Sequence, residues 1–84
     1  MAEQPLRNFV LMTTVGCHLC DDATALLCQT LDPALHQLEA EDIAFDDQLM
    51  EKYAVRIPVL VEEATGRELG WPFDADDIRA FVAQ

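Results

Sequence analysis

The chain has 84 residues, of which 51% are hydrophobic and 25% are charged. This composition is typical of one small globular domain, which we expect to span residues 1–84, and it excludes a disordered polar tail. Sixteen acidic residues against five basic ones give a formal net charge of −11, which argues against nucleic acid or an anionic membrane as a partner.

The location expected from the sequence is the cytoplasm. No apolar run approaches the roughly 20 residues that span a bilayer, and the first ten residues lack the pattern of a secretory signal. The three cysteines are an odd number in a reducing compartment, so we expect no framework of structural disulfides.

The first predicted elements are a strand and a helix. The segment "RNFVLMTT", residues 7–14, has four consecutive apolar residues, as in a strand buried on both faces. A helix over residues 17–31 follows, and "DP" at 32 and 33 ends it. The helical spacing comes from five apolar residues that we expect to face the sheet, Leu19, Ala23, Leu26, Leu27 and Leu31.

The middle of the chain predicts a second strand and a short helix. Alternating side chains favour a strand from about 36 to 43, with or without a short helix from Pro33 before it. The next helix begins at Asp46 or Asp47 and ends at Tyr53, with Leu49, Met50 and Tyr53 on one face.

The last third of the chain predicts a hairpin and a helix. "RIPVLVEE", residues 56–63, and "RELGW", residues 67–71, are strands joined by the turn "EEATG". Asp74 and Asp77 form an Asp-x-x-Asp variant of the capping box, and Ile78, Phe81 and Val82 form the buried stripe of the closing helix. The order β-α-β-α-β-β-α indicates an α/β fold, a four-stranded mixed sheet with helices on both faces.

This order, with "CxxC" at the first strand-to-helix turn and Ile57-Pro58 opening the third strand, resembles the thioredoxin fold. The chain is most similar to the small glutaredoxin-like proteins of bacteria. The stretches "TTVGCHLCDDA", "YAVRIPVLV" and "GRELGWPFD" carry the resemblance, which extends from about Arg7 to Val82. It implies that Cys17 is the exposed nucleophile, that Cys20 is the resolving cysteine and that Pro58 is a cis-proline facing the dithiol.

Helix geometry supports a reactive dithiol at this position. The first turn of a helix has free N–H groups and a partial positive charge, which stabilise a thiolate. Three residues make slightly less than one turn, so the sulfurs of Cys17 and Cys20 can approach to bonding distance. Two structural cysteines without turnover are the alternative.

Three charged or titratable neighbours modify this expectation. His18 either lowers the pKa of the Cys17 thiol when protonated or is a plain surface residue. Asp21 and Asp22 are expected to raise the pKa of that thiol, because negative charge disfavours a thiolate, or they serve only as capping and solubilising residues.

Cys28 is expected to be a half-buried structural residue. It lies eleven residues after Cys17, about 16 Å along the helix, which is too far for a disulfide within the monomer. A role in dimerisation or glutathionylation is the alternative.

Neither a metal nor another cofactor is expected. One "CxxC" supplies two ligands where a structural zinc site needs four, and His36 is the one distant histidine. Zinc or an iron–sulfur cluster bridging two copies stays open.

Glutathione is a candidate thiol co-substrate, but the chain departs from the pattern of residues with which glutaredoxins bind it. Residues 13–15 supply no base before Cys17, and Gly70 has no second glycine beside it. The candidate substrate-binding residues lie beside the dithiol, around the proline of the third strand and in the turn before the last helix: His18, Arg56, Ile57 (through its backbone), Pro58, Gly70, Trp71 and Asp74. Trp71 is either a groove wall or plain packing. The net charge does not steer an anionic tripeptide inward.

The sequence therefore predicts a monomeric thiol–disulfide oxidoreductase that acts on disulfides of proteins or small thiols. A thioredoxin-fold binding module or metal carrier without turnover is the competing hypothesis.

Overall fold

The computed structural model describes residues 6–84. Its elements in chain order are β1 (Arg7–Thr13), α1 (His18–Thr30), β2 (His36–Asp42), a 3-10 helix η1 (Ile43–Phe45), α2 (Asp47–Tyr53), β3 (Val59–Glu62), β4 (Glu68–Gly70) and α3 (Ala75–Val82). The predicted order of strands and α-helices is confirmed, and η1 is added between β2 and α2.

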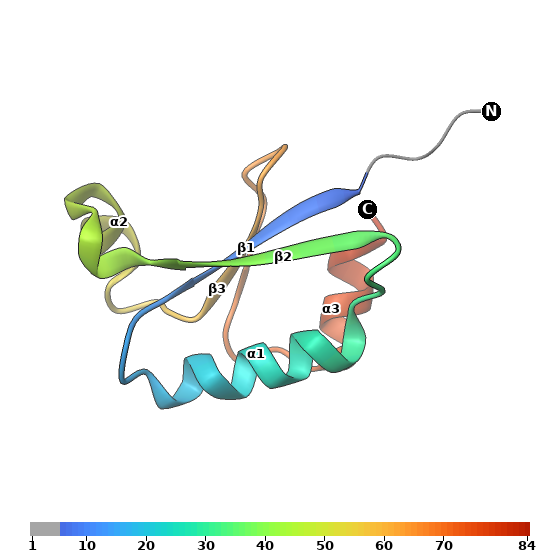
Figure 1. The fold of residues 1–84 in the computed structure, drawn as a ribbon, viewed down its shortest axis with the longest axis horizontal. Helices are drawn as coiled ribbons and strands as arrows, with labels where there is room; N and C mark the ends of the chain where they lie inside the picture. Colours follow the sequence, from blue (N-terminus) through green and yellow to red (C-terminus); the bar gives the residue numbers. More distant parts are fainter. Residues whose placement is uncertain (1–5) are drawn as a thin grey trace.

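The four strands form one mixed sheet in the order β2-β1-β3-β4 (Figure 1). β1 pairs with β2 in parallel over its whole length, and α1 makes the crossover between them. β3 runs antiparallel to both β1 and β4. The carboxyl ends of β1 and β2 and the amino end of β3 therefore lie at the same edge of the sheet.

Helices cover both faces of the sheet, as predicted. Phe9 and Leu11 of β1 point to one face, where they pack with α1 and α3 around Leu27 and Ile78. Met12 points to the other face, where the second core cluster contains residues of η1 and α2. Figure 1 shows α1 and α3 together below the sheet and α2 at the far left, beyond the end of β2.

Two predicted core positions are wrong. The buried face of α1 consists of Cys20, Ala23 and Leu27, whereas Leu19 is 47% exposed. Successive residues are about 100° apart around a helix. Because Cys20 lies on the buried face of α1, its neighbour Leu19 is rotated away from the sheet toward solvent. Met50 of α2 is likewise exposed, because Tyr53 fills the buried face of that helix.

The predicted strand over residues 56–63 begins only at Val59. The chain after α2 first forms a tight turn, in which the N–H groups of Arg56 and Ile57 both donate to the Tyr53 carbonyl, at 2.8 and 3.1 Å. The Ile57–Pro58 peptide bond that follows this turn is cis.

The segment between α1 and β2 is a turn rather than a short helix. Asp32 organises it, because its side chain accepts from the Ala34 N–H at 2.9 Å and its carbonyl accepts from the His36 N–H at 2.8 Å. The N–H of Asp32 in turn donates to Nδ1 of His36 at 3.1 Å. Pro33 thus lies in a closed loop that leads directly into β2.

The predicted capping box at α3 is confirmed. Asp74 is the N-cap and accepts from the Asp77 N–H at 2.8 Å, while the Asp77 carboxylate accepts from the Asp74 N–H at 3.0 Å. No helix within residues 6–84 is long and apolar enough to cross a membrane.

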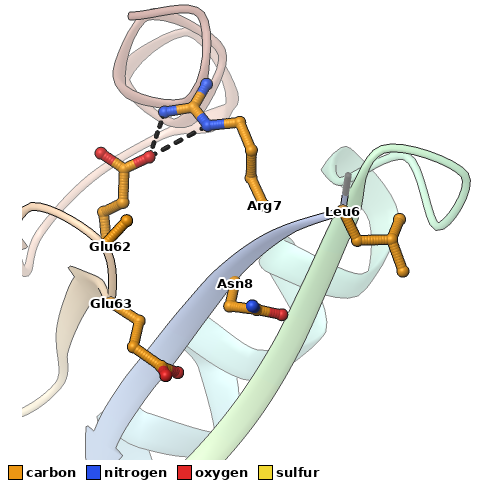
Figure 2. Close-up of a pocket in the computed structure, with 6 residues that line it drawn as sticks. Leu6, Arg7, Asn8, Glu62 and Glu63 are labelled. Carbon is orange, nitrogen blue, oxygen red and sulfur yellow. Dashed lines mark hydrogen bonds and ion pairs between the residues drawn. The ribbon is translucent and has the colours of Figure 1, made fainter. Parts of the chain in front are cut away.

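A buried carboxylate ties the carboxyl end of α3 to the sheet. Glu62, at the end of β3, is held between the guanidinium groups of Arg7 and Arg67, and each of these arginines also donates to a carbonyl of α3. We call these three side chains the arginine clamp. Figure 2 shows its Arg7–Glu62 half at the start of β1.

Candidate functional site

The "CxxC" motif lies where β1 passes into α1. Gly16, with φ of +81°, makes the turn that glycine tolerates at this angle, and Cys17 is the N-cap of α1. The Cys20 N–H donates to the Cys17 sulfur at 3.2 Å. This places the Cys17 sulfur against the free amide end of the helix, as the sequence predicts.

The two sulfurs are joined in a disulfide, with their Cα atoms 5.2 Å apart. Cys17 is half-buried and Cys20 is only 1% exposed. The pair therefore fits a CxxC redox motif in its oxidised form, with one sulfur that solvent reaches and one that the fold shields.

The charged neighbours of the dithiol all lie on the outer side of α1. His18 is exposed, and its Nε2 is 3.9 Å from an Asp22 carboxylate oxygen one turn later. Asp21 lies in the first turn and is also exposed. The side chain of His18 is therefore directed along the helix surface toward Asp22.

The start of β3 lies beside the end of β1. Met12 pairs with Val59, so the buried Pro58, one residue earlier, adjoins the point where β1 leaves the sheet for Cys17. The Pro58 carbonyl accepts from the Trp71 N–H at 3.1 Å, which extends the β3–β4 ladder by one bond. The sheet thus brings Pro58 and Trp71 together at the edge that carries the dithiol.

The backbone N–H of Ile57 is already used within the chain, because it donates to the Tyr53 carbonyl. A substrate that pairs with this residue must therefore use its carbonyl oxygen. The side chain of Ile57 is half-buried against the second core cluster.

Arg56 is not a free cation in this structure. Its Nη2 donates to Glu68 at 2.5 Å, and the same carboxylate accepts from the Tyr53 hydroxyl at 2.7 Å and lies 3.5 Å from the Lys52 ammonium. Lys52 and Arg56 also stack on the Tyr53 ring, 5.1 and 5.2 Å from its centre.

These contacts shift the pKa values of the groups involved. The hydrogen bond from Arg56, and then that from Tyr53, lower the pKa of Glu68. The pKa of Tyr53 is raised, chiefly because the phenol is buried. Sequence reasoning missed Tyr53 and Glu68 as partners of Arg56, because nothing in the spacing of these residues indicates that β4 passes next to α2.

The remaining predicted substrate-binding residues follow β3 in the fold. Gly70 ends β4 opposite Val59, and the Trp71–Pro72 bond after it is cis. The half-buried Trp71 packs edge-on against Phe73, with ring centres 5.1 Å apart. Asp74 is exposed, but its carboxylate is engaged in the capping box.

Cys28 is exposed, so the expectation of a half-buried residue is wrong. The buried face of α1 passes through Ala23 and Leu27, and Cys28 lies about 100° beyond it. Its thiol borders an apolar cavity of about 230 Å³ between α1 and β2, together with Leu27, Leu31 and His36.

A larger cavity, of about 340 Å³, is far from the dithiol. Its lining consists of Leu6, Arg7, Asn8, Glu62, Glu63 and Ala64 (Figure 2). Arg7 opens β1 and Cys17 follows its end, so the full length of the strand separates cavity and dithiol. Within residues 6–84 no three His, Cys, Asp or Glu side chains gather in a way that could hold a metal ion.

Comparison with protein families identifies a family that covers almost the whole chain. Residues 8–83 match the family described as glutaredoxin-like domain (DUF836). No curated protein matches the chain.

Two solved structures are similar to this one over almost their whole length. The X-ray structure of Northeast Structural Genomics target protein XcR50 from X. campestris has 37% sequence identity and a TM-score of 0.77, covering 89% of this chain and 95% of that one. The solution NMR structure of protein Ne2328 from Nitrosomonas europaea has 30% identity and a TM-score of 0.71, covering 96% and 98%. The resemblance to glutaredoxin-like proteins and the thioredoxin-like fold are thereby confirmed.

Proposed function

Because the chain belongs to the glutaredoxin-like domain family (DUF836), we propose that it is a thiol–disulfide oxidoreductase with Cys17 and Cys20 as its catalytic pair. The observation that carries the proposal is the inequality of the two sulfurs. Cys17 is half-buried at the N-cap of α1, and its sulfur accepts a hydrogen bond from the Cys20 N–H. Cys20 itself is buried.

The reaction starts from the reduced dithiol. The Cys17 thiolate attacks one sulfur of a substrate disulfide, the substrate S–S bond breaks, and the other substrate sulfur leaves as a thiolate that takes a proton from water. Cys20 then loses its proton and attacks the Cys17 sulfur, which forms the Cys17–Cys20 disulfide and releases the second substrate thiol. Two electrons pass from the protein to the substrate, and an external thiol reductant restores the dithiol.

The fold supplies two groups for the first step. The N–H of Cys20, which already points at the Cys17 sulfur at 3.2 Å, stabilises negative charge on that sulfur. The start of α1 adds its partial positive charge, against which Asp21 and Asp22 act.

Substrate binding in this proposal uses the edge formed by Pro58 and Trp71. The N–H of Ile57 is hydrogen-bonded to the Tyr53 carbonyl. An extended substrate backbone can therefore hydrogen-bond to Ile57 only through its carbonyl oxygen. Arg56 binds a substrate only if the substrate displaces Glu68 from its guanidinium group. Asp74 likewise binds a substrate only if the substrate displaces the Asp77 N–H from its carboxylate. Glutathione, whose carboxylates need free cations, is therefore a weaker co-substrate than a dithiol protein.

Variants of the cysteines test the catalytic assignment. We expect Cys17→Ser to lose turnover of a small disulfide by at least about a hundredfold, because the nucleophile is removed. Cys20→Ser should accumulate a mixed disulfide on Cys17, which intact-mass spectrometry detects. Cys28→Ser is the control and should keep wild-type turnover. Wild-type turnover by Cys17→Ser would refute the proposal.

A titration in glutathione redox buffers, quenched by alkylation, distinguishes the modes of action. A Cys17–Cys20 disulfide that forms at a defined ratio supports the dithiol mechanism. Glutathione accumulating on Cys17 would favour monothiol chemistry, and three free thiols at every ratio would favour a binding module without turnover.

A further inference from the structure

Large apolar side chains are exposed mainly at the dithiol edge of the sheet. Val15 follows β1, Phe45 follows β2, and Val55 precedes β3; they are 89, 89 and 99% exposed. Because β1 and β2 are parallel and β3 is antiparallel to β1, these three loops lie at one end of the molecule. The half-exposed Leu19 lies there too, in the first turn of α1.

A hydrogen bond links the first two of these loops. The Thr14 hydroxyl donates to the Asp42 carboxylate at 3.0 Å, and Asp42 also caps η1 by accepting from the Ala44 N–H at 2.9 Å. Val15 is the residue after Thr14, and Phe45 ends η1, so this hydrogen bond links the two loops that carry these residues. Cys17 is two residues from Val15, which puts apolar surface next to the reactive sulfur.

The same end of the molecule is strongly acidic. Residues 14–22 and 41–56 contain seven acids and two bases. The two bases, Lys52 and Arg56, pair with the same carboxylate, that of Glu68, which offsets one of their two positive charges and leaves the net charge of this end negative. Exposed apolar residues with a rim of one charge sign mark a docking surface whose partner carries the opposite charge.

We propose that this surface docks a protein segment whose disulfide is flanked by basic and apolar residues, with Val15, Phe45 and Val55 as the apolar contacts. The inference rests on the proposed function and names the substrate class of its site. The chemistry is the exchange described above, in which the two electrons of the dithiol reduce the disulfide of the segment. An anionic small disulfide such as oxidised glutathione is disfavoured by the same charges.

Single-turnover kinetics with two matched peptides test this substrate class. Both peptides are closed by one internal disulfide and carry a phenylalanine beside a cysteine; one has lysines and the other glutamates at the flanking positions. Pre-reduced protein is mixed with each peptide, quenched in acid, alkylated and analysed by mass for the Cys17–Cys20 disulfide. Rates are divided by those with dithiothreitol, which removes differences in intrinsic reactivity between the peptides.

We expect the lysine peptide to react at least about tenfold faster than the glutamate peptide at low ionic strength. The difference should shrink in roughly 0.5 M salt, because screening shortens the reach of exposed charges. Reversing rim charges with Asp47→Lys/Glu51→Lys should remove the preference, whereas Glu39→Lys/Glu63→Lys, away from this edge, should retain most of it.

The apolar contacts are tested by Phe45→Ser/Val55→Ser. These side chains are exposed, so the variant should fold, which circular dichroism checks. We expect it to lose about fivefold or more in rate with the lysine peptide, while Leu35→Ser, which removes a half-exposed apolar side chain near the start of β2, changes little.

The outcomes separate the two proposals. Equal rates with both peptides, or a faster reaction with the glutamate peptide or oxidised glutathione, would overturn the substrate class and leave the redox function standing. A dithiol that stays reduced with every disulfide would overturn both.

Discussion

The exposed thiol of Cys28 is chemically separate from the dithiol. It lies eleven residues after Cys17, about 16 Å along α1, so it cannot join the Cys17–Cys20 exchange within one chain. A thiol in this position can be oxidised only by a partner outside its own molecule. Cys28 is therefore the position at which oxidation should link two copies of the chain.

We predict that the thiol oxidant diamide converts wild-type protein into a disulfide-linked dimer, visible on a non-reducing gel. Cys28→Ser should remain monomeric, although its Cys17–Cys20 disulfide still closes. The matched control is Cys17→Ser/Cys20→Ser, which keeps Cys28 and should still form the dimer. Dimers of Cys28→Ser would show that one of the catalytic cysteines makes the link instead.

Single residues also show how far sequence could anticipate the site. The place of Cys17 at a helix start follows from local signals, namely an apolar strand, a glycine and a helical repeat. The burial of Cys20 and the exposure of Leu19 depend on how α1 is rotated against the sheet, which a shift of one residue in the repeat decides. The partners of Arg56 depend on a strand that lies beyond it in the chain, and local patterns carry no such information.

Among the elements, α3 depends most clearly on its first turn. The helix has only eight residues, so the free N–H groups at its start are a large part of its hydrogen-bonding capacity. The reciprocal bonds between Asp74 and Asp77 satisfy two donors there. The next acid, Asp76, instead pairs on the surface with Arg79 at 3.0 Å.

We predict that Asp74→Ala lowers the free energy of unfolding by about 1 kcal/mol, because the N-cap acceptor is lost. Asp76→Ala, a substitution of the same kind within the same helix, should change it by less than about 0.5 kcal/mol, since exposed ion pairs contribute little. Urea denaturation followed by far-UV circular dichroism measures both. Equal effects of the two substitutions would show that the box adds nothing beyond surface charge.

The elements themselves could largely be predicted, because their signals are local. The strand over residues 7–14 and the helix over 17–31 differ from the structure by one residue at each end or less. The third predicted strand is too long at its start, because the β-branched pattern extends back to Ile57 whereas β3 begins at Val59. At Ile57 the backbone is still in a turn, since its N–H donates to the Tyr53 carbonyl. Tertiary hydrogen bonds, not propensity, set that boundary.

At the scale of the whole molecule, the arginine clamp joins residues that are distant in the chain. Glu62 is 4% exposed and accepts from Arg7, 55 residues earlier, and from Arg67 in the turn between β3 and β4. An acid at the end of a predicted strand is ordinarily exposed, so the sequence does not reveal this pair of partners. Burial alone would raise the pKa of Glu62, but hydrogen bonds from Arg7, Thr65 and Arg67 lower it from 4.5 to about 2.

This pKa makes the clamp a source of acid sensitivity. The pKa of Glu62 is lower in the folded chain than in the unfolded chain, so its contribution to stability is fully present above about pH 4.5. It is lost as the pH falls toward about 2, because protons then bind the folded carboxylate and the ion pairs disappear. The contribution of Glu62 to the pH dependence of stability is obtained as a difference between wild type and a Glu62 variant.

We therefore predict that Glu62→Gln, which keeps the size of the side chain, destabilises the protein at pH 7 by about 3 kcal/mol, because two partly buried guanidinium groups lose their counter-charge. The gap in unfolding free energy between wild type and variant should narrow as the pH falls from about 4.5 toward 2. Glu63→Gln, the exposed neighbour, is the control and should track wild type at every pH. Urea unfolding at a series of pH values measures all three, and a gap that stays constant across this window would show that the clamp acts through packing and not through charge.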